Sequence, residues 1–263
     1  MTSTAALLLA LGVAWHGVQP GMAWSQLRFS KEGALSSVNV VVVRIDPRVL
    51  SLRLERASED YGLRATWTVA RMPADALAAF NAGQFIGGIP WGWLVVDGVE
   101  QKAPGTGRLA MSLVLDRTGR AQLVTPAELP AIRGQAQFAF QSYPMLLAGG
   151  GEIPWELLAP GRGIDLGHRD SRLAIGITRS GEVIVALTRF SIAGDVAGSL
   201  PWGPTVPEMA VFMRGLGADR AMMLDGGISS QLAVRGADGV ARRWANWRPV
   251  PLAVIATRRQ RLP

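Results

Sequence analysis

The sequence predicts an α+β fold, with a mixed, mostly antiparallel sheet and a few packed helices in a single domain. Strand-like runs outnumber helical ones, and the short turn signals between them indicate hairpins, which pair strands antiparallel. Hydrophobic residues make up 49% of the 263 residues and charged residues 18%. Because apolar segments recur along the whole chain and no stretch has the composition of a linker, we expect one large domain.

Residues that favour strands dominate the first part of this domain. Ser37–Ile45 and Val49–Glu55 are dense in β-branched residues or alternate apolar with polar side chains, so both are predicted strands. Thr66–Arg71 fits a short helix. Ala76–Phe80 predicts a buried strand that carries Asn81 into a loop.

Turn residues then divide the middle of the chain into hairpins. Each predicted unit is a strand, a turn and, where the pattern is clear, a second strand: Leu94–Val96 with Asp97–Gly98, Leu109–Leu115 with Arg117–Gly119, and Arg172–Ile177 with Ser180–Gly181 and Val183–Leu187. The chain ends with another predicted strand, Pro249–Ala256.

The clearest helix is Glu208–Leu216, because its apolar residues fall on one face. Pro207 stands at its start and Gly217 follows its end, as helix boundaries favour. A short strand, Ala221–Leu224, comes next. The chain must then turn sharply at Asp225–Gly227.

The N-terminus predicts export. Ala5–Val13 is an apolar run of signal-peptide length, too short to span a membrane, and small residues Gly12 and Ala14 precede Trp15. We therefore expect a leader at residues 1–14, a folded domain at 15–263, and a periplasmic or secreted protein. A retained leader would hold the protein near a membrane. The alternative is that the run forms a buried strand or helix.

Composition excludes several kinds of chemistry. The chain has no cysteine and two histidines, which removes disulfides, cysteine nucleophiles and cysteine-ligated zinc, and argues against a histidine triad. The net charge of +7 is compatible with nucleic acid, a membrane surface or an anionic substrate. Because the basic residues are dispersed, no nucleic-acid partner is predicted. No metal or other cofactor is predicted, although the carboxylates leave a divalent cation such as calcium open.

Three loop segments hold more glycine and polar residues than turns require. They are Asn81–Phe85, Gln141–Leu146 and Leu224–Ser230. Glycine lets the backbone approach a ligand closely, and a carboxylate at a strand end suits catalysis or binding to sugar hydroxyls. From spacing alone, however, turn formation explains these segments at least as well.

Six ordered segments carry a family resemblance: WHGVQPG at 15–21, NAGQF at 81–85, GWLVVDG at 92–98, QSYPML at 141–146, RLAIG at 172–176 and DGGISS at 225–230. Together they resemble the phosphodiester glycosidase family, whose domain occurs in a lysosomal uncovering enzyme and in bacterial proteins linked to exopolysaccharide. Two residues depart from the family pattern, Gln84 and Tyr143. These departures bear on the substrate more than on the fold.

The resemblance implies a hydrolase that cleaves a sugar-1-phosphodiester in envelope or exopolysaccharide metabolism. Asp225 is the candidate catalytic carboxylate, acting as nucleophile or as base for water. Arg172 and Asn81 complete the catalytic candidates: Arg172 would bind the phosphate or an adjacent carboxylate, and Asn81 sugar hydroxyls or phosphate oxygens. The remaining candidates for substrate binding are Gly83, Gln141, Ser142, Gly226, Gly227, Ser229 and Ser230.

Structural roles stay open for the same residues. Arg172 could form an ion pair at a strand start, and Asn81 or Asp225 could hold a turn. A non-catalytic saccharide-binding protein and an assembly partner of a polysaccharide export machine are the alternative functions. If the enzymatic hypothesis holds, Asn81, Gln141, Arg172, Asp225 and Ser230 should converge on one pocket that takes a saccharide or glycosyl phosphate. Asp97 and Asp170 are the next carboxylates to consider.

Overall fold

Antiparallel strands build most of the computed structural model, which describes residues 13–30, 37–57, 66–159, 161, 165–191 and 203–259. The predicted leader, residues 1–14, lies outside this set except for its last two residues. The second of these already contacts the domain, because the carbonyl of Ala14 accepts a hydrogen bond from Ser25 Oγ at 2.7 Å. In the described part of the chain, no helix is long and apolar enough to cross a membrane.

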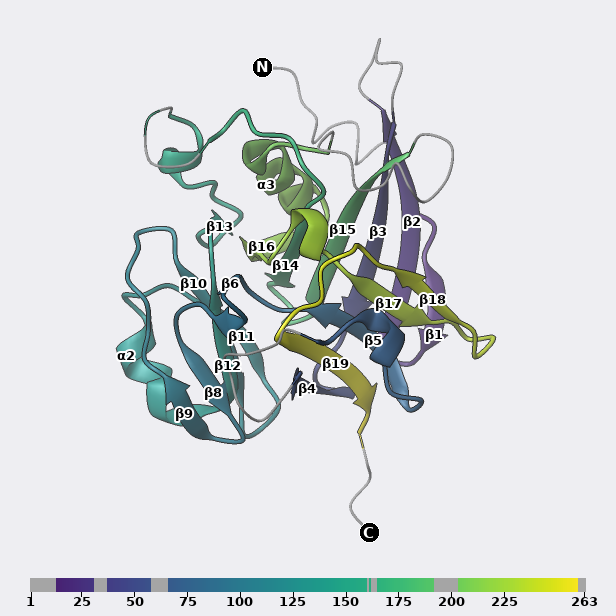
Figure 1. The fold of residues 1–263 in the computed structure, drawn as a ribbon, viewed down its shortest axis with the longest axis horizontal. Helices are drawn as coiled ribbons and strands as arrows, with labels where there is room; N and C mark the ends of the chain where they lie inside the picture. The colour runs from purple at the N-terminus through teal and green to yellow at the C-terminus, as the bar shows by residue number, and fades with distance from the viewer. Residues whose placement is uncertain are drawn as a thin grey trace.

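The largest sheet has seven strands in the order β1-β2-β3-β15-β14-β16-β13 (Figure 1). Their bounds are β1 His16–Gln19, β2 Met22–Ser30, β3 Ser37–Ile45, β13 Met145–Leu147, β14 Leu173–Thr178, β15 Val183–Ser191 and β16 Ala218–Met223. The valines of β3, Val40–Val43, are all buried, which is expected where both faces of a strand are covered. They pair with β2 on one side and with β15 on the other.

A second sheet has five strands in the order β11-β10-β12-β8-β9. Their bounds are β8 Leu94–Val96, β9 Val99–Lys102, β10 Met111–Asp116, β11 Ala121–Val124 and β12 Ala136–Ser142. Residues of β12 pair with β10 on one side and with β8 on the other. The end of β12 turns directly into β13 of the large sheet, so this turn joins the two sheets.

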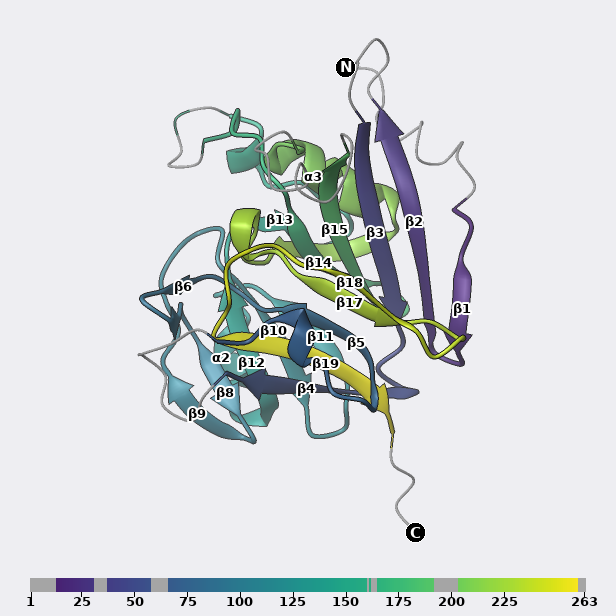
Figure 2. The same cartoon turned by 45° about the vertical axis from the view of Figure 1, so that its right-hand side comes forward.

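A third sheet has the order β18-β17-β5-β19-β4. Their bounds are β4 Leu50–Arg56, β5 Ala76–Asn81, β17 Leu232–Arg235, β18 Ala241–Trp244 and β19 Leu252–Arg258, and β6 Phe85–Ile86 pairs separately with β7 Ile89–Pro90. The β17–β18 hairpin runs beside β1 and β2 of the large sheet (Figure 2). There Trp244 meets Trp24 with ring centroids 5.8 Å apart.

Two short α-helices are described, α2 Leu129–Ile132 and α3 Val206–Gly215. A capping box starts α3: Glu208 N donates to Thr205 Oγ1 at 3.3 Å, and Thr205 N donates to Glu208 Oε2 at 2.9 Å. Gly217, at φ +89°, lies just past the end of the helix. The buried face of α3 covers strands β13, β14 and β16 (Figure 1).

The fold class is therefore corrected in part. The mostly antiparallel sheet is confirmed, but the described chain is richer in strand than a balanced α+β protein. The mixed character is not observed, since every strand pairing in the described residues is antiparallel. The predicted helix Thr66–Arg71 is also largely wrong: Trp67 forms a β-bridge with Val250, and only Val69–Arg71 is a 3₁₀ helix.

Candidate active site

Asp225 lies just beyond β16, where that strand and the end of β5 meet. Its backbone N–H donates to the carbonyl of Ala82 at 3.1 Å. Asn81 Nδ2 donates to the carbonyl of Asp225 at 2.9 Å, and Asn81 Oδ1 accepts from Gln231 N at 2.7 Å. Asn81 is 0% exposed, so its amide offers no surface to a ligand. The amide instead joins the end of β5 to the loop that follows β16. In this structure Asn81 positions Asp225.

The carboxylate of Asp225 has an unusual electrostatic environment. Burial raises the pKa of this carboxyl from 3.8 to about 6, while hydrogen bonding by Ser229 and the positive charge of Arg248 act in the opposite direction. A pKa near 6 keeps the group mostly ionised at neutral pH and still able to take up a proton. Carboxyls with such shifts are concentrated at catalytic sites.

A glycine turn brings a second carboxylate, that of Asp170, to the same place. Gly227 has φ +56°, and a Cβ built there would lie 2.7 Å from Asp170 Oδ2. The N–H of Gly227 donates to the carbonyl of Ser171 at 2.8 Å, which holds the two loops together. The position therefore requires glycine both for its backbone conformation and for the approach of the carboxylate.

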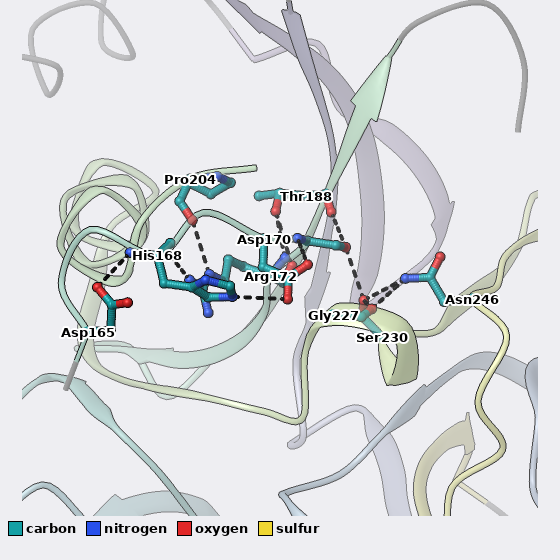
Figure 3. Close-up of polar contacts among 10 residues, drawn as sticks. Asp165, His168, Asp170, Arg172, Thr188, Pro204, Gly227, Ser230 and Asn246 are labelled. Atoms are coloured by element: carbon teal, nitrogen blue, oxygen red, sulfur yellow. Dashed lines mark hydrogen bonds and ion pairs between the residues drawn. The ribbon is translucent and has the colours of Figure 1, made fainter. Parts of the chain in front are cut away.

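Asp170 is itself held by local contacts (Figure 3). Its Oδ1 accepts from Ser171 N at 2.7 Å, and its Oδ2 lies 3.6 Å from His168 Nε2. These contacts place a carboxylate and an imidazole beside the Gly227 turn, which follows Asp225 in the chain. They belong to the site, although the sequence alone favours a solvated loop for both.

Ser230 is a structural part of the site. Its Oγ lies 3.0 Å from Ser171 Oγ, donates to the carbonyl of Gly227 at 2.7 Å and is 3.1 Å from Asn246 Nδ2 (Figure 3). Asn246 also donates to the carbonyl of Gly227 at 2.6 Å. These bonds of the buried Ser230 stabilise the turn that follows Asp225, whereas the side chain of Ser229 hydrogen-bonds the Asp225 carboxyl itself.

Two N–H groups of the Arg172 guanidinium donate to backbone carbonyls (Figure 3). Its Nε donates to Pro204 O at 3.0 Å and its Nη2 to His168 O at 2.6 Å. Burial lowers the pKa of this guanidinium, and the nearby Asp170 opposes that change. Arg172 thus ties the loop before β14 to the segment that precedes α3.

Gln84 joins the three loop segments that the sequence singled out. Its Oε1 accepts from Ser142 Oγ at 2.9 Å and from Tyr143 N at 3.0 Å, while its Nε2 donates to the carbonyls of Tyr143 and Leu224. Ser142 Oγ also donates to the carbonyl of Met223. The departure from the family pattern at Gln84 therefore has a structural use next to Asp225.

The backbones of Gln141 and Gly83 pack against each other near Gln84. The side chain of Gln141 is bonded elsewhere. Gln141 is buried, and its Oε1 accepts from Trp93 N at 3.1 Å and from Gly105 N at 2.7 Å. A Cβ at Gly83 would lie 2.5 Å from the carbonyl oxygen of Gln141, so this glycine permits close packing of two loops. Gly226 is similar, because its Cβ would lie 3.0 Å from the carbonyl of Ser171.

The predicted residues are thus brought together, but with different roles. Four of them lie in one region. Asn81 bonds directly to Asp225, and Ser230 contacts Ser171, the chain neighbour of Arg172. Gln141 joins them by its backbone, while its side chain faces Gly105. Asp97 lies elsewhere, in the turn between β8 and β9, with φ +51°.

Two residues of the site were not predicted, Asn246 and Arg248. They belong to the segment between β18 and β19, which contains no glycine and no carboxylate. That segment, ANWRPVP at 245–251, contains none of the patterns that marked the other site residues. Their place beside Asp225 depends on the β17–β18 hairpin returning the chain to that point.

A cavity of about 820 Å³ lies at the other end of β16. Its two carboxylates are already paired: Glu128 with Arg220 at 2.6 Å, and Asp219 with Arg179 at 3.0 Å. We therefore place the candidate site at Asp225. Within the described ranges, no group of three or more His, Cys, Asp or Glu side chains is arranged to hold a metal ion.

Comparison with known proteins identifies the family. The model of the phosphodiester glycosidase family matches residues 74–257, more than half of the chain. The chain belongs to this family. A comparison with curated proteins finds no match.

Solved structures share the fold. A hypothetical protein from Synechocystis superposes with a TM-score of 0.63 at 17% identity, over 94% of this chain and 64% of its own. The catalytic domain of zebrafish N-acetylglucosamine-1-phosphodiester alpha-N-acetylglucosaminidase, auto-inhibited by its pro-peptide, gives 0.63 at 17% identity over 96% and 91%. A putative exported protein from Burkholderia pseudomallei gives 0.59 at 16% identity, over 84% of this chain and 74% of its own.

Proposed function

We propose that the protein is an exported hydrolase that releases a sugar from a glycosyl phosphodiester, with Asp225 as its catalytic carboxylate. The observation that carries the proposal is the raised pKa of Asp225, about 6, at the loop junction of a phosphodiester glycosidase fold. The zebrafish protein of similar fold is named for this kind of reaction. Export is supported by the apolar N-terminus and by the description of the Burkholderia protein.

In the proposed reaction, the bond between sugar C1 and the bridging phosphate oxygen breaks. The electron pair stays on that oxygen, which leaves as part of a phosphate monoester, and water adds its hydroxyl to C1 and releases a proton. Because the phosphate is a stable anion, its departure requires less protonation than that of an alkoxide. Asp225 stabilises the oxocarbenium-like transition state, as nucleophile or as base for water.

The second carboxylate supports the same reaction. Glycosidases commonly use two carboxyl groups on either side of the scissile bond. Asp170, beside the Gly227 turn and 3.6 Å from His168 Nε2, is our candidate for exchanging a proton with water or the departing group. We further propose a role in envelope or exopolysaccharide metabolism, on the strength of the family resemblance.

A panel of sugar-1-phosphodiesters tests the proposed function. Purified protein should release free sugar from at least one α- or β-linked member. Because Asp225 must be ionised to act, kcat/KM should fall as the pH drops below about 6. Binding of a saccharide without release of free sugar from any member would favour the non-catalytic alternative.

A further inference from the structure

The backbone of Arg248 is fixed against the turn that follows Asp225. Its N–H donates to the carbonyl of Ile228 at 2.9 Å, and its carbonyl accepts from Gln231 Nε2 at 3.0 Å. Gln231 is fully buried, and its Oε1 accepts from Val69 N at 3.0 Å. These hydrogen bonds fix the backbone of Arg248, and therefore the point from which its side chain extends, relative to the turn after Asp225.

An aromatic ring supports the guanidinium of Arg248. Its Cζ lies 4.7 Å from the centroid of the Phe85 ring, next in sequence to Gln84. Arg248 is exposed, and within the described residues its guanidinium has no hydrogen bond or ion pair. Stacking on a ring restrains the plane of a guanidinium while its N–H groups remain available to a ligand.

The charge of Arg248 also reaches the site, because it acts on the carboxylate of Asp225. Arg172 differs on both counts, since it is partly buried and donates to the carbonyls of His168 and Pro204. A phosphate placed beside Asp225 would therefore find more open donors on Arg248 than on Arg172, two of whose N–H groups are already bonded to carbonyls. Arginine suits such a ligand because its fork of N–H groups matches two phosphate oxygens.

We infer that Arg248 forms an anion site beside Asp225 and binds the phosphate of the substrate, while Arg172 holds the surrounding loops. This inference rests on the proposed function for the identity of the substrate. In the reaction, Arg248 would stabilise the negative charge that develops on the departing phosphate. The site thus divides into a carboxylate for the sugar and a cation for the phosphate.

Binding of inorganic phosphate, measured by isothermal titration calorimetry, tests the inference without requiring turnover. We expect the wild-type protein to bind phosphate and Arg248→Ala to bind it at least about 10-fold more weakly. Arg248→Gln, which retains a polar side chain but no charge, should behave like Arg248→Ala and serves if the latter does not fold. Arg117→Ala, in the exposed turn between β10 and β11, is the matched control and should bind like the wild type.

Equal phosphate affinity in the wild type and the Arg248 variants would overturn the inference, as would absence of wild-type binding in the millimolar range. The outcome is separable from that of the substrate panel. Phosphate binding that depends on Arg248 in a protein without turnover would support the anion site and refute the proposed hydrolysis. Phosphodiester turnover that is unchanged in Arg248→Ala would refute the anion site and leave the hydrolysis intact.

Discussion

Replacing Asp225 with asparagine should stabilise the protein at neutral pH. The folded structure raises the pKa of this carboxyl from 3.8 to about 6, which corresponds to about 3 kcal/mol against the charged form. A group with a raised folded pKa contributes stability that is present below 3.8 and lost as the pH rises through about 6. The uncharged amide does not titrate, so the variant avoids this loss.

Urea denaturation of both proteins between about pH 4 and about pH 8 measures the effect. We expect the free energy of unfolding of Asp225→Asn to exceed that of the wild type by up to about 3 kcal/mol at the upper end of this range. The difference should shrink as the pH falls through about 6. A variant that is less stable at about pH 8, or a difference that does not change with pH, would refute the account of a partly buried, desolvated carboxylate.

Two further predictions concern other parts of the molecule. Arg220 holds the pKa of Glu128 at about 2, so Glu128→Gln should lose stability above pH 4.5 and match the wild type as the pH falls towards 2. Because the pair is partly exposed, urea denaturation should show a loss of about 1 kcal/mol at most. Gly227→Ala should cost about 1–2 kcal/mol for its left-handed backbone, and should lower kcat/KM because the new Cβ displaces Asp170. Gly239→Ala, also at positive φ but with nothing within 4 Å of its Cβ, should share the stability cost and leave kcat/KM unchanged.

Local patterns sufficed to predict the elements that carry strong signals. The β-branched run Ser37–Ile45 forms β3 with the expected bounds. The turn residues Ser180–Gly181 correctly predicted the hairpin formed by β14 and β15. The helix α3 was predicted from its apolar face and from Pro207 and Gly217 at its ends. In each of these elements, the residues that decide the structure lie within a few positions of one another.

Elements that depend on distant partners were missed. The strand β12, Ala136–Ser142, has no turn signal of its own and is held between β10 and β8. The nine-residue strand β2 likewise depends on its pairing with β3. Such strands are stabilised by neighbours that the local sequence does not reveal.

Residues that the sequence singled out do lie near one another in the structure, but their contacts could not be predicted from it. Asn81 is the last residue of β5 and Gln141 lies near the end of β12, so both stand at strand ends instead of in the expected loops, while Ser230 lies in the loop after Asp225. Their polar atoms are nevertheless bonded to backbone or to each other, which a sequence cannot indicate. Conversely, Arg248 has open donors beside Asp225, and nothing in its local sequence distinguishes it from the other arginines.

The rate of sugar release by Asp225→Asn, relative to the wild type, tests the central claim most directly. On a glycosyl phosphodiester that the wild type hydrolyses, we expect kcat to fall on the order of 10³-fold or more while the variant stays folded. Asp97→Asn, the same change in a turn away from the site, should retain wild-type kcat. Near-normal turnover by folded Asp225→Asn would contradict the account, because it would show that the reaction does not require this carboxylate.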